Sequence, residues 1–162
     1  MSIALDFRPR QNWDRMFSEA EAANLTDFEL SMEALPADLI FIVDGTDISW
    51  FAEIPMLDFA ASLFVAAHTL SSTDTRERFI SPDLAPWWTL EFINGDSVRI
   101  SRQGLQAQAF CELAELRIAS ARFGIRVYET FVKAYPSALT SNTLREWYPL
   151  DSMKLALLSL DI

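Results

Sequence analysis

The segment LIFIVDGTDISW (residues 39–50) decides how this chain folds, because it places two apolar runs on either side of Asp44-Gly45. Asp-Gly favours a tight turn with positive backbone φ, and such a turn joins two antiparallel strands. With a two-residue loop, Leu39 faces Trp50 on the apolar side of the pair. The segment therefore predicts an antiparallel β-hairpin.

The stretch IPMLDFAASLFVAAHTL (54–70) follows this hairpin and is apolar on nearly every side of a helix. Pro55 suits the first helical turn, where its missing N–H is not needed, and Asp58 lies near the positive end of the helix dipole. A helix without a polar face belongs inside the protein. We expect a central buried helix over 54–70.

A second pair of apolar runs, WWTLEFI (87–93) and SVRIS (97–101), is separated by residues 94–96, Asn-Gly-Asp. A three-residue loop places Trp88 and Leu90 on the same face as Val98 and Ile100, whereas a two-residue loop places them on opposite faces. The pattern therefore predicts a second antiparallel hairpin with the longer loop.

The remaining segments are assigned by the period of their apolar residues. We expect an amphipathic helix over 11–24, a strand over 28–34, a short strand over 76–80, a long helix over 105–135 bent at Gly124, and a short amphipathic piece over 142–148; residues 152–160 fit a strand or a helix. The predicted fold class is α+β, one domain over 1–162. Its antiparallel β-sheet is built from hairpins, with the central buried helix and the long C-terminal helix packed on one face.

Composition excludes several classes of protein. The chain has 162 residues, of which 51% are apolar, so a packed core is expected. One Cys cannot form an internal disulfide, and one Cys with one His cannot build a usual zinc site. The start, MSIALDFRPRQNW (1–13), lacks the apolar stretch of a secretion signal, and no apolar run reaches the length of a membrane span. We expect a cytoplasmic protein without a membrane interaction.

No recognisable catalytic motif occurs in the sequence. Cys111 lies in an apolar pattern typical of an inert core thiol. His68 is ten residues from Asp58 and points about 80° away from it around a helix, so the two cannot form a dyad there. Asp44-Gly45-Thr46-Asp47 lacks the spacing of a calcium loop, and there is no glycine-rich phosphate loop. We therefore predict no catalytic residues, no metal and no organic cofactor.

Charge is distributed unevenly along the chain. The net charge is −10, and no Lys or Arg occurs between Arg15 and Arg76, a stretch that holds eleven acids. Such acidity makes nucleic acid an improbable direct partner. A concentrated negative surface instead raises the rate of association with a basic protein and suppresses wrong partners.

The expected partner-binding surface collects the acids around the first hairpin. A strand over 28–34 would place Glu29 and Glu33 on one polar face, while Asp44 and Asp47 cap the next hairpin, so these side chains could converge. A tryptophan beside acids, such as Trp50, packs in the core or serves as a binding hot spot, and the sequence favours neither. The predicted surface comprises Asp27, Glu29, Glu33, Asp44, Asp47 and Glu53, with Trp50 as its anchor.

The sequence resembles the small, acidic, cytoplasmic immunity proteins that bacteria pair with polymorphic or contact-dependent toxins. The resemblance is one of type, and it lies in the α+β build, the acidic hairpin and the apolar central helix beginning EIPMLDFA (53–60). It implies a non-catalytic inhibitor that binds a cognate, basic toxin domain and caps its active site. It assigns no binding residues, because such interfaces differ between immunity proteins.

Two alternatives remain open. The first is an enzyme that uses Asp58, an acid within an apolar helix, together with Arg117 or Arg122. Without a catalytic role, Asp58 lies at the polar edge of that helix or pairs with an Arg of the later helix. A non-catalytic subunit of a larger assembly would instead expose a broad apolar patch, for which Trp87 and Trp147 are candidates.

Overall fold

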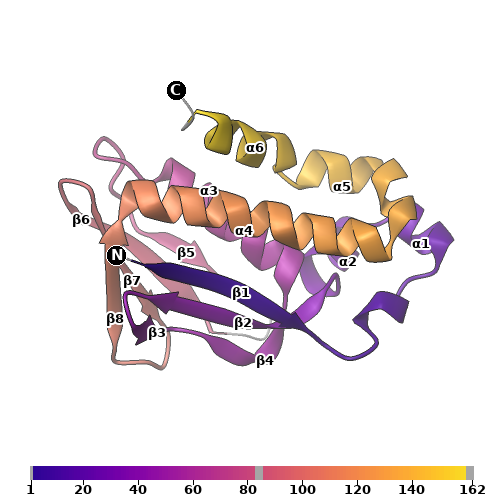
Figure 1. The fold of residues 1–162 in the computed structure, drawn as a ribbon, viewed down its shortest axis with the longest axis horizontal. Helices are drawn as coiled ribbons and strands as arrows, with labels where there is room; N and C mark the ends of the chain where they lie inside the picture. The colour runs from indigo at the N-terminus through magenta and orange to yellow at the C-terminus, as the bar shows by residue number, and fades with distance from the viewer. Residues whose placement is uncertain (1, 83–85, 160–162) are drawn as a thin grey trace.

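The computed structural model describes residues 2–82 and 86–159 and shows an α+β fold with two antiparallel four-stranded sheets (Figure 1). In the first sheet β2 (Pro36–Val43) is the central strand. It pairs on one side with β1 (Ile3–Pro9) and on the other with β3 (Thr46–Asp47) and β4 (Trp50–Pro55). The second sheet follows chain order: β5 (Arg78–Ile80), β6 (Trp88–Asn94), β7 (Ser97–Arg102) and β8 (Gln108–Glu112).

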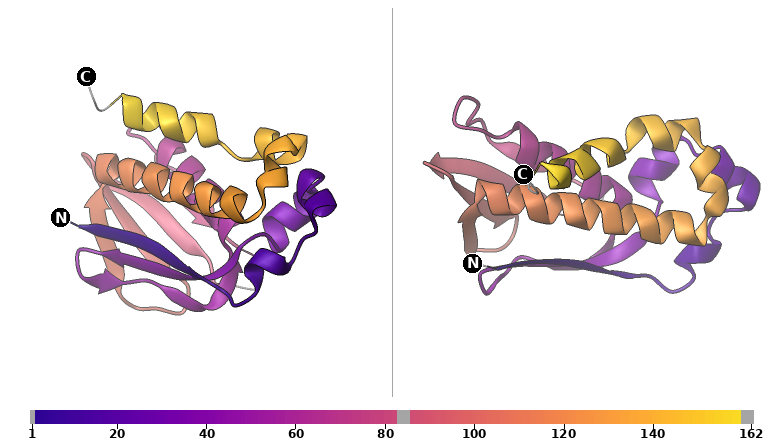
Figure 2. Two further views of the ribbon diagram at one scale, coloured as in Figure 1. Left: turned by 45° about the vertical axis from the view of Figure 1, so that its right-hand side comes forward. Right: turned by 45° about the horizontal axis from the view of Figure 1, so that its top comes forward.

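The helices cover one side of the sheets and one end of the molecule (Figure 1). They are α1 (Glu19–Ala23), α2 (Asp27–Met32), α3 (Met56–Thr69), α4 (Leu113–Ala134), α5 (Asn142–Trp147) and α6 (Leu150–Leu158), with 3-10 turns at Trp13–Arg15 and Pro136–Thr140. α3 and α4 pack side by side, α4 also contacts β1, and α3 contacts β2, β4 and β5. Both views of Figure 2 show α6 lying over α4 on the side away from β1.

The first hairpin has the predicted register. Ile42 lies opposite Asp47 and Leu39 opposite Trp50, so the loop has two residues. Asp44 and Gly45 both have positive φ, 49° and 83°, as this tight turn requires. Further along, the register shifts by a bulge between Ala37 and Leu39, because Ala37 pairs with Ile54.

The second hairpin and its shared apolar face are confirmed, but the loop has two residues, 95 and 96, rather than the predicted three, because Asn94 pairs with Ser97. Leu90 pairs with Ile100 and Phe92 with Val98, and the buried face carries Trp88, Leu90, Val98 and Ile100. A bulge between Phe92 and Asn94 tightens the turn without changing that face.

The predicted strand over 28–34 is wrong: this segment holds helix α2. Thr26 and Glu29 form a capping box, in which the Glu29 backbone N–H donates to the Thr26 hydroxyl at 3.1 Å and the Thr26 N–H donates to the Glu29 carboxylate at 3.2 Å. Leu30 and Ala34 are buried, and their spacing of four suits a helix as well as it suits a strand. Two hydrogen bonds at the start of the segment select the helix.

Two other segments differ from the prediction at their ends. Residues 11–24 form a 3-10 turn and then the short α1, because Ser18 begins α1 with its own capping box to Glu21. Residues 108–112 of the predicted long helix are strand β8, where burial alternates with period two and supplies β7 with a partner. The N-terminal strand β1 was not predicted.

The C-terminal part is helical. The ambiguous segment 152–160 is resolved as helix through Leu158, and Leu160 lies outside the described residues. α4 runs unbroken through Gly124, where a bend was predicted, and the glycine serves packing: a Cβ at this position would lie 2.6 Å from Met153 Sδ of α6. Glycine therefore allows α6 to approach α4 closely.

The two sheets are joined through buried polar contacts. The indole N–H of Trp88 in β6 donates to the Ile48 carbonyl oxygen at 2.9 Å, and the Arg102 guanidinium of β7 donates to the Ser49 carbonyl oxygen at 2.9 Å. The fully buried Phe59 of α3 has its ring 5.1 Å from that of Trp88. Trp88 thus links both sheets to the central helix.

We predict that Trp88→Phe lowers the free energy of unfolding by about 1–3 kcal/mol, because the Ile48 carbonyl loses its donor inside the core. Urea denaturation followed by circular dichroism measures the effect. Trp87→Phe is the matched control, since Trp87 is 43% exposed, and it should change stability by less than about 0.5 kcal/mol. Equal effects of the two substitutions would show that the bond between the sheets contributes nothing.

Candidate functional site

The predicted acidic surface is divided between the two ends of β2. Asp27 and Glu29 lie on α2 and Glu33 ends it, just before β2 begins, whereas Asp44 and Asp47 lie at the turn after β2 ends. Eight residues of strand separate the groups by roughly 25 Å, and Figure 1 shows α2 and β3 toward opposite ends of the molecule. The expectation that these acids converge is wrong, because it required α2 to be a strand.

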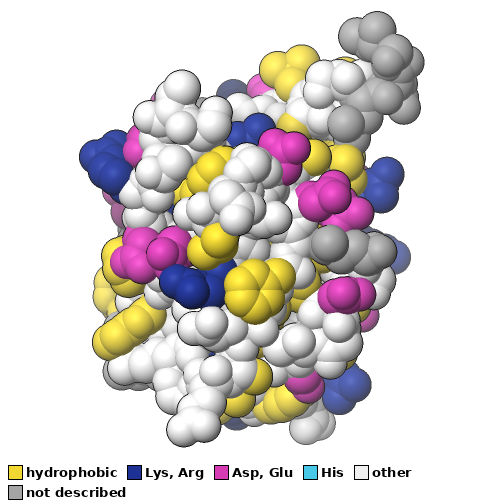
Figure 3. Space-filling model, turned by 90° about the vertical axis from the view of Figure 1, so that its left-hand side faces the viewer, with side chains coloured by type: hydrophobic (Ala, Val, Ile, Leu, Met, Phe, Trp, Pro, Cys, Tyr) yellow, Lys and Arg dark blue, Asp and Glu magenta, His cyan; other side chains and the backbone are white. Residues whose placement is uncertain are grey.

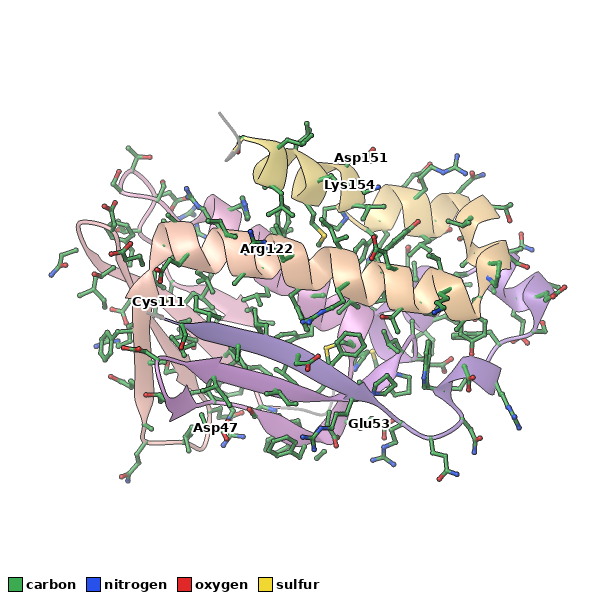
Figure 4. The ribbon with its side chains drawn as sticks, in the orientation of Figure 1. Asp47, Glu53, Cys111, Arg122, Asp151 and Lys154 are labelled. Carbon is green, nitrogen blue, oxygen red and sulfur yellow. The ribbon has the colours of Figure 1, made fainter. Side chains whose placement is uncertain are left out.

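Several of these acids stabilise the local fold. Glu29 belongs to the α2 capping box, and Asp47 accepts the Ser49 backbone N–H at 2.9 Å. Hydrogen bonds from Ser49 lower the pKa of the Asp47 carboxyl below its ordinary value. Glu53 pairs with Arg10 at 2.8 Å, and Figure 4 shows it apart from Asp47. Three of the six acids therefore have a structural role within the chain, which explains them without a binding partner.

Trp50, the predicted anchor, is only partly exposed. It is half-buried, and the Arg102 guanidinium lies over its ring, 5.2 Å from the ring centre. The exposed aromatic residues nearby in sequence are Phe51, 58% exposed on β4, and Phe28, 60% exposed on α2. Phe28 escaped prediction because it was assigned to the inner face of a strand, although it stands between two acids.

The end of the molecule near the hairpin turns carries mixed charge. Figure 3 shows acidic and basic side chains interspersed on this face, with separate hydrophobic patches between them. The hairpin acids therefore do not form one continuous negative patch on this face. The segment 19–33, which spans α1 and α2, differs, because it contains five acids and no Lys or Arg.

Asp58 lies in a groove of about 420 Å³ along the outer side of α3. The floor is made of small side chains of α3, and the walls come from β5 on one side and from the α5–α6 connection on the other. The lining residues are Asp58, Ala61, Ser62, Val65, Ala66, Thr69, Arg78, Phe79, Trp147 and Pro149. Sequence reasoning singled out Asp58 and Trp147 but could not place them in one groove.

The carboxyl of Asp58 has no compensating charge within the described residues. It takes part in no ion pair and no side-chain hydrogen bond there, and burial raises its pKa to about 6. Its position in the first turn of α3 supplies the favourable end of the helix dipole. Asp58 therefore remains a half-buried acid that is ionised only in part near pH 6.

The arginines proposed as partners of Asp58 lie elsewhere. Arg117 donates to the carbonyl oxygens of Ala67 and Leu70, at the far end of α3. Arg122 lines a different hollow, between β1 and α4, and Figure 4 shows it on α4. The expected pairing of Asp58 with either arginine is wrong, and the enzyme hypothesis loses the charge partner that it required.

The two remaining reactive side chains are accounted for by packing. Cys111 is buried in β8 rather than in a helix, and burial raises the pKa of its thiol to about 12, as an inert core thiol requires. The ring of His68 is half-buried against Phe64, and its Nδ1 is 2.9 Å from the Phe64 carbonyl oxygen. Burial lowers the pKa of His68, and the contact with the Phe64 carbonyl oxygen satisfies one nitrogen of the ring.

Two further observations concern the described part of the chain. In residues 2–82 and 86–159, no three His, Cys, Asp or Glu side chains gather closely enough to hold a metal ion. None of the helices described there combines the length and apolar character of a membrane span.

We predict that Asp58→Asn makes the protein more stable relative to the wild type as pH rises. The folded state raises the pKa of Asp58 from 3.8 to about 6, so the folded protein holds this proton more firmly than the unfolded chain. The Asp58 contribution to stability is therefore greatest below pH 4 and is lost as pH rises through 6. Asparagine does not ionise and avoids the loss.

The difference between variant and wild type should grow by about 1–2 kcal/mol from pH 4 to pH 8, allowing for solvent around a half-buried carboxyl. Urea denaturation at both pH values measures it. Asp44→Asn, in an exposed turn, controls for the change in net charge. A difference that does not change with pH would mean that burial does not disfavour the ionised form of Asp58.

Comparison with known proteins gives no relative for this chain. No family model matches it, and neither a curated protein nor a solved structure matches it. The roles of the groove and of the acidic helices therefore rest on their own geometry and charge.

Proposed function

We propose that this protein is a non-catalytic binding protein of the immunity type, which neutralises a basic toxin domain by binding it through the acidic α1–α2 end. The observation that supports this proposal is Phe28, which is 60% exposed on α2 between Asp27 and Glu29. An exposed aromatic side chain amid acids suits a partner that offers an apolar pocket rimmed by basic residues.

The charge of this end supports the same role. Residues 14–33 contain Asp14, Glu19, Glu21, Asp27, Glu29 and Glu33 against the single Arg15. Such a concentration of one sign attracts a basic protein over a distance of about one Debye length, 8 Å at physiological salt. Fast capture is what an inhibitor of a harmful enzyme needs.

The two helices are held firmly enough to present these side chains in fixed positions. Each begins with a capping box, and Leu25 and Leu30 are buried beneath them. α1 packs against the 3-10 turn at 136–140, and α2 packs against α3 and α5. A surface that is already ordered loses less entropy on binding than a flexible one.

A genetic experiment tests the class of function. The open reading frame adjacent to the gene for this chain is expressed alone in a bacterial host, where it should arrest growth, and co-expression of this chain should restore growth. An adjacent product that is harmless, or growth arrest that this chain does not relieve, would rule out the immunity role.

A binding experiment with that toxin domain tests the surface. We predict that Asp27→Lys with Glu33→Lys lowers the association rate at least tenfold at 50 mM salt, and less at 500 mM salt, because steering is screened. Asp44→Lys with Asp47→Lys changes the net charge equally at the other end of β2 and should have the smaller effect. Surface plasmon resonance measures both, after thermal melting confirms that each variant is folded.

Phe28→Ala should act on dissociation instead. Loss of a central aromatic contact costs about 2 kcal/mol, which corresponds to roughly thirtyfold weaker binding. If the hairpin pair alone slows association, or Phe28→Ala leaves the affinity unchanged, the partner binds elsewhere and the assignment of the α1–α2 end is wrong.

A further inference from the structure

The groove along α3 leaves part of an otherwise buried helix uncovered. α3 has nine buried residues, yet Val65 is 50% exposed, and Asp58, Ser62 and Thr69 lie along the same side. The groove runs from Asp58 to Thr69, eleven residues of helix or roughly 16 Å. This length and the small side chains of its floor leave room for an inserted side chain and the chain segment that bears it.

The walls of the groove are apolar and aromatic. Trp147 and Pro149 line one side, and Phe79, 61% exposed, lines the other. A residue with a long aliphatic stem can bury that stem between such walls while its charged end reaches a polar group. Aromatic faces also attract cations that lie over them.

Among the described residues that line the groove, Asp58 is the charged side chain without an ion-pair partner. The titratable and charged side chains in the lining are Asp58 on α3 and Arg78 on β5, and the wall formed by Trp147 and Pro149 adds none. Arg78 donates to the Thr69 hydroxyl and carbonyl oxygens and pairs with Asp74 at 2.9 Å. Arg78 is therefore held by Asp74, which it shares with Arg76, at the far end of the groove, and the acid lies at the Asp58 end.

We propose that this groove receives a lysine or arginine side chain of a basic polypeptide, with Asp58 as its counter-ion and Trp147 and Phe79 as walls for its aliphatic stem. A neutral apolar ligand would bury the carboxylate further without pairing it, and an anion would be repelled by it. A cationic side chain with an aliphatic stem can pack that stem against the apolar walls and pair its charge with the carboxylate of Asp58.

The position of the groove connects it with the proposed function, on which this inference rests for the identity of the polypeptide. The α3 end that carries Asp58 adjoins α2, because the Met56 N–H donates to the Leu35 carbonyl oxygen just after α2. α2 also contacts α5, which supplies Trp147 to the groove. A basic partner drawn to α2 can therefore place one side chain beside Asp58.

Short peptides test the groove without the toxin. The probes are acetylated and amidated pentapeptides, Gly-Ser-X-Ser-Gly, with Arg, Lys, norleucine or Glu at X. Amide and indole chemical shifts of the ¹⁵N-labelled full chain, recorded during titration at pH 7.5, report binding. We expect the Arg and Lys peptides to shift the signals of Ser62, Val65 and the Trp147 indole, and the norleucine and Glu peptides to leave them in place.

Three variants give the proposal its controls. Asp58→Asn should weaken binding of the Arg and Lys peptides about ten- to a hundredfold, as expected for loss of a charge-assisted pair. Ser62→Leu should block binding by filling the floor while Asp58 remains. Asp38→Asn removes an acid that does not line the groove and should leave binding unchanged. Thermal melting confirms the fold of each variant.

Binding of the Arg peptide should also strengthen between pH 5 and pH 7, because the Asp58 carboxyl, whose pKa is about 6, becomes ionised in this range. Equal binding of the norleucine peptide, or full affinity in Asp58→Asn, would falsify the proposal. The variant with Asp27→Lys and Glu33→Lys should still bind the peptide. Toxin association that this double substitution leaves unchanged, with peptide binding intact, would contradict the proposed function alone. Slowed toxin association, together with a wild-type chain that does not bind the Arg peptide, would contradict the groove alone.

Discussion

A helix that is apolar on nearly every side must be covered on every side, and this requirement on α3 organises the molecule. Both sheets, α4 and α2 pack around it, although they come from segments spread over most of the chain. Phe59 lies at the centre of this arrangement, with its ring against those of Phe41, Trp88 and Phe123. Burial of such rings is the largest favourable contribution that a core of this size can offer.

The same requirement explains where the candidate groove is. Among the described residues, the cover over α3 is incomplete along the side that carries Asp58, Ser62 and Val65, where β5 and the α5–α6 connection flank the helix without closing over it. An acid in the first turn is tolerated there because the helix dipole favours it and water still reaches it. A complete cover would have to bury that carboxylate or pair it.

The sequence predicted those parts of the fold whose signals are local. Asp44-Gly45 and the two flanking apolar runs determine a hairpin within twelve residues, and the register followed directly. The segment 28–34 was misassigned because Leu30 and Ala34, four residues apart, satisfy the period of a strand and that of a helix alike. Thr26 and Glu29, spaced as a capping box, carried the distinguishing information. Strand β8 was missed because five alternating residues run directly into a long helix.

The candidate site was less accessible than the fold. Asp58 stood out as an acid in an apolar helix, but the walls of its groove come from residues 78–79 and 147–149, far away in the sequence. Their meeting depends on how β5 and the C-terminal helices pack, which no local pattern specifies. The acidic residues could be recognised as a group in the sequence. Their predicted convergence required residues 28–34 to form a strand; this segment is a helix, and the two groups of acids lie at opposite ends of β2.

The bulge between β2 and β4 has a consequence for how this protein behaves in a crowded solution. Among the described residues β4 pairs only with β2, so its other side is an open edge that carries the exposed Phe51. A straight apolar edge invites strand addition by another copy and growth into aggregates. Here the register shift and the left-handed backbone of Glu53, with φ of 58°, interrupt the regular row of N–H and C=O groups. The irregularity of β4 therefore disfavours edge-to-edge strand pairing between copies of this chain.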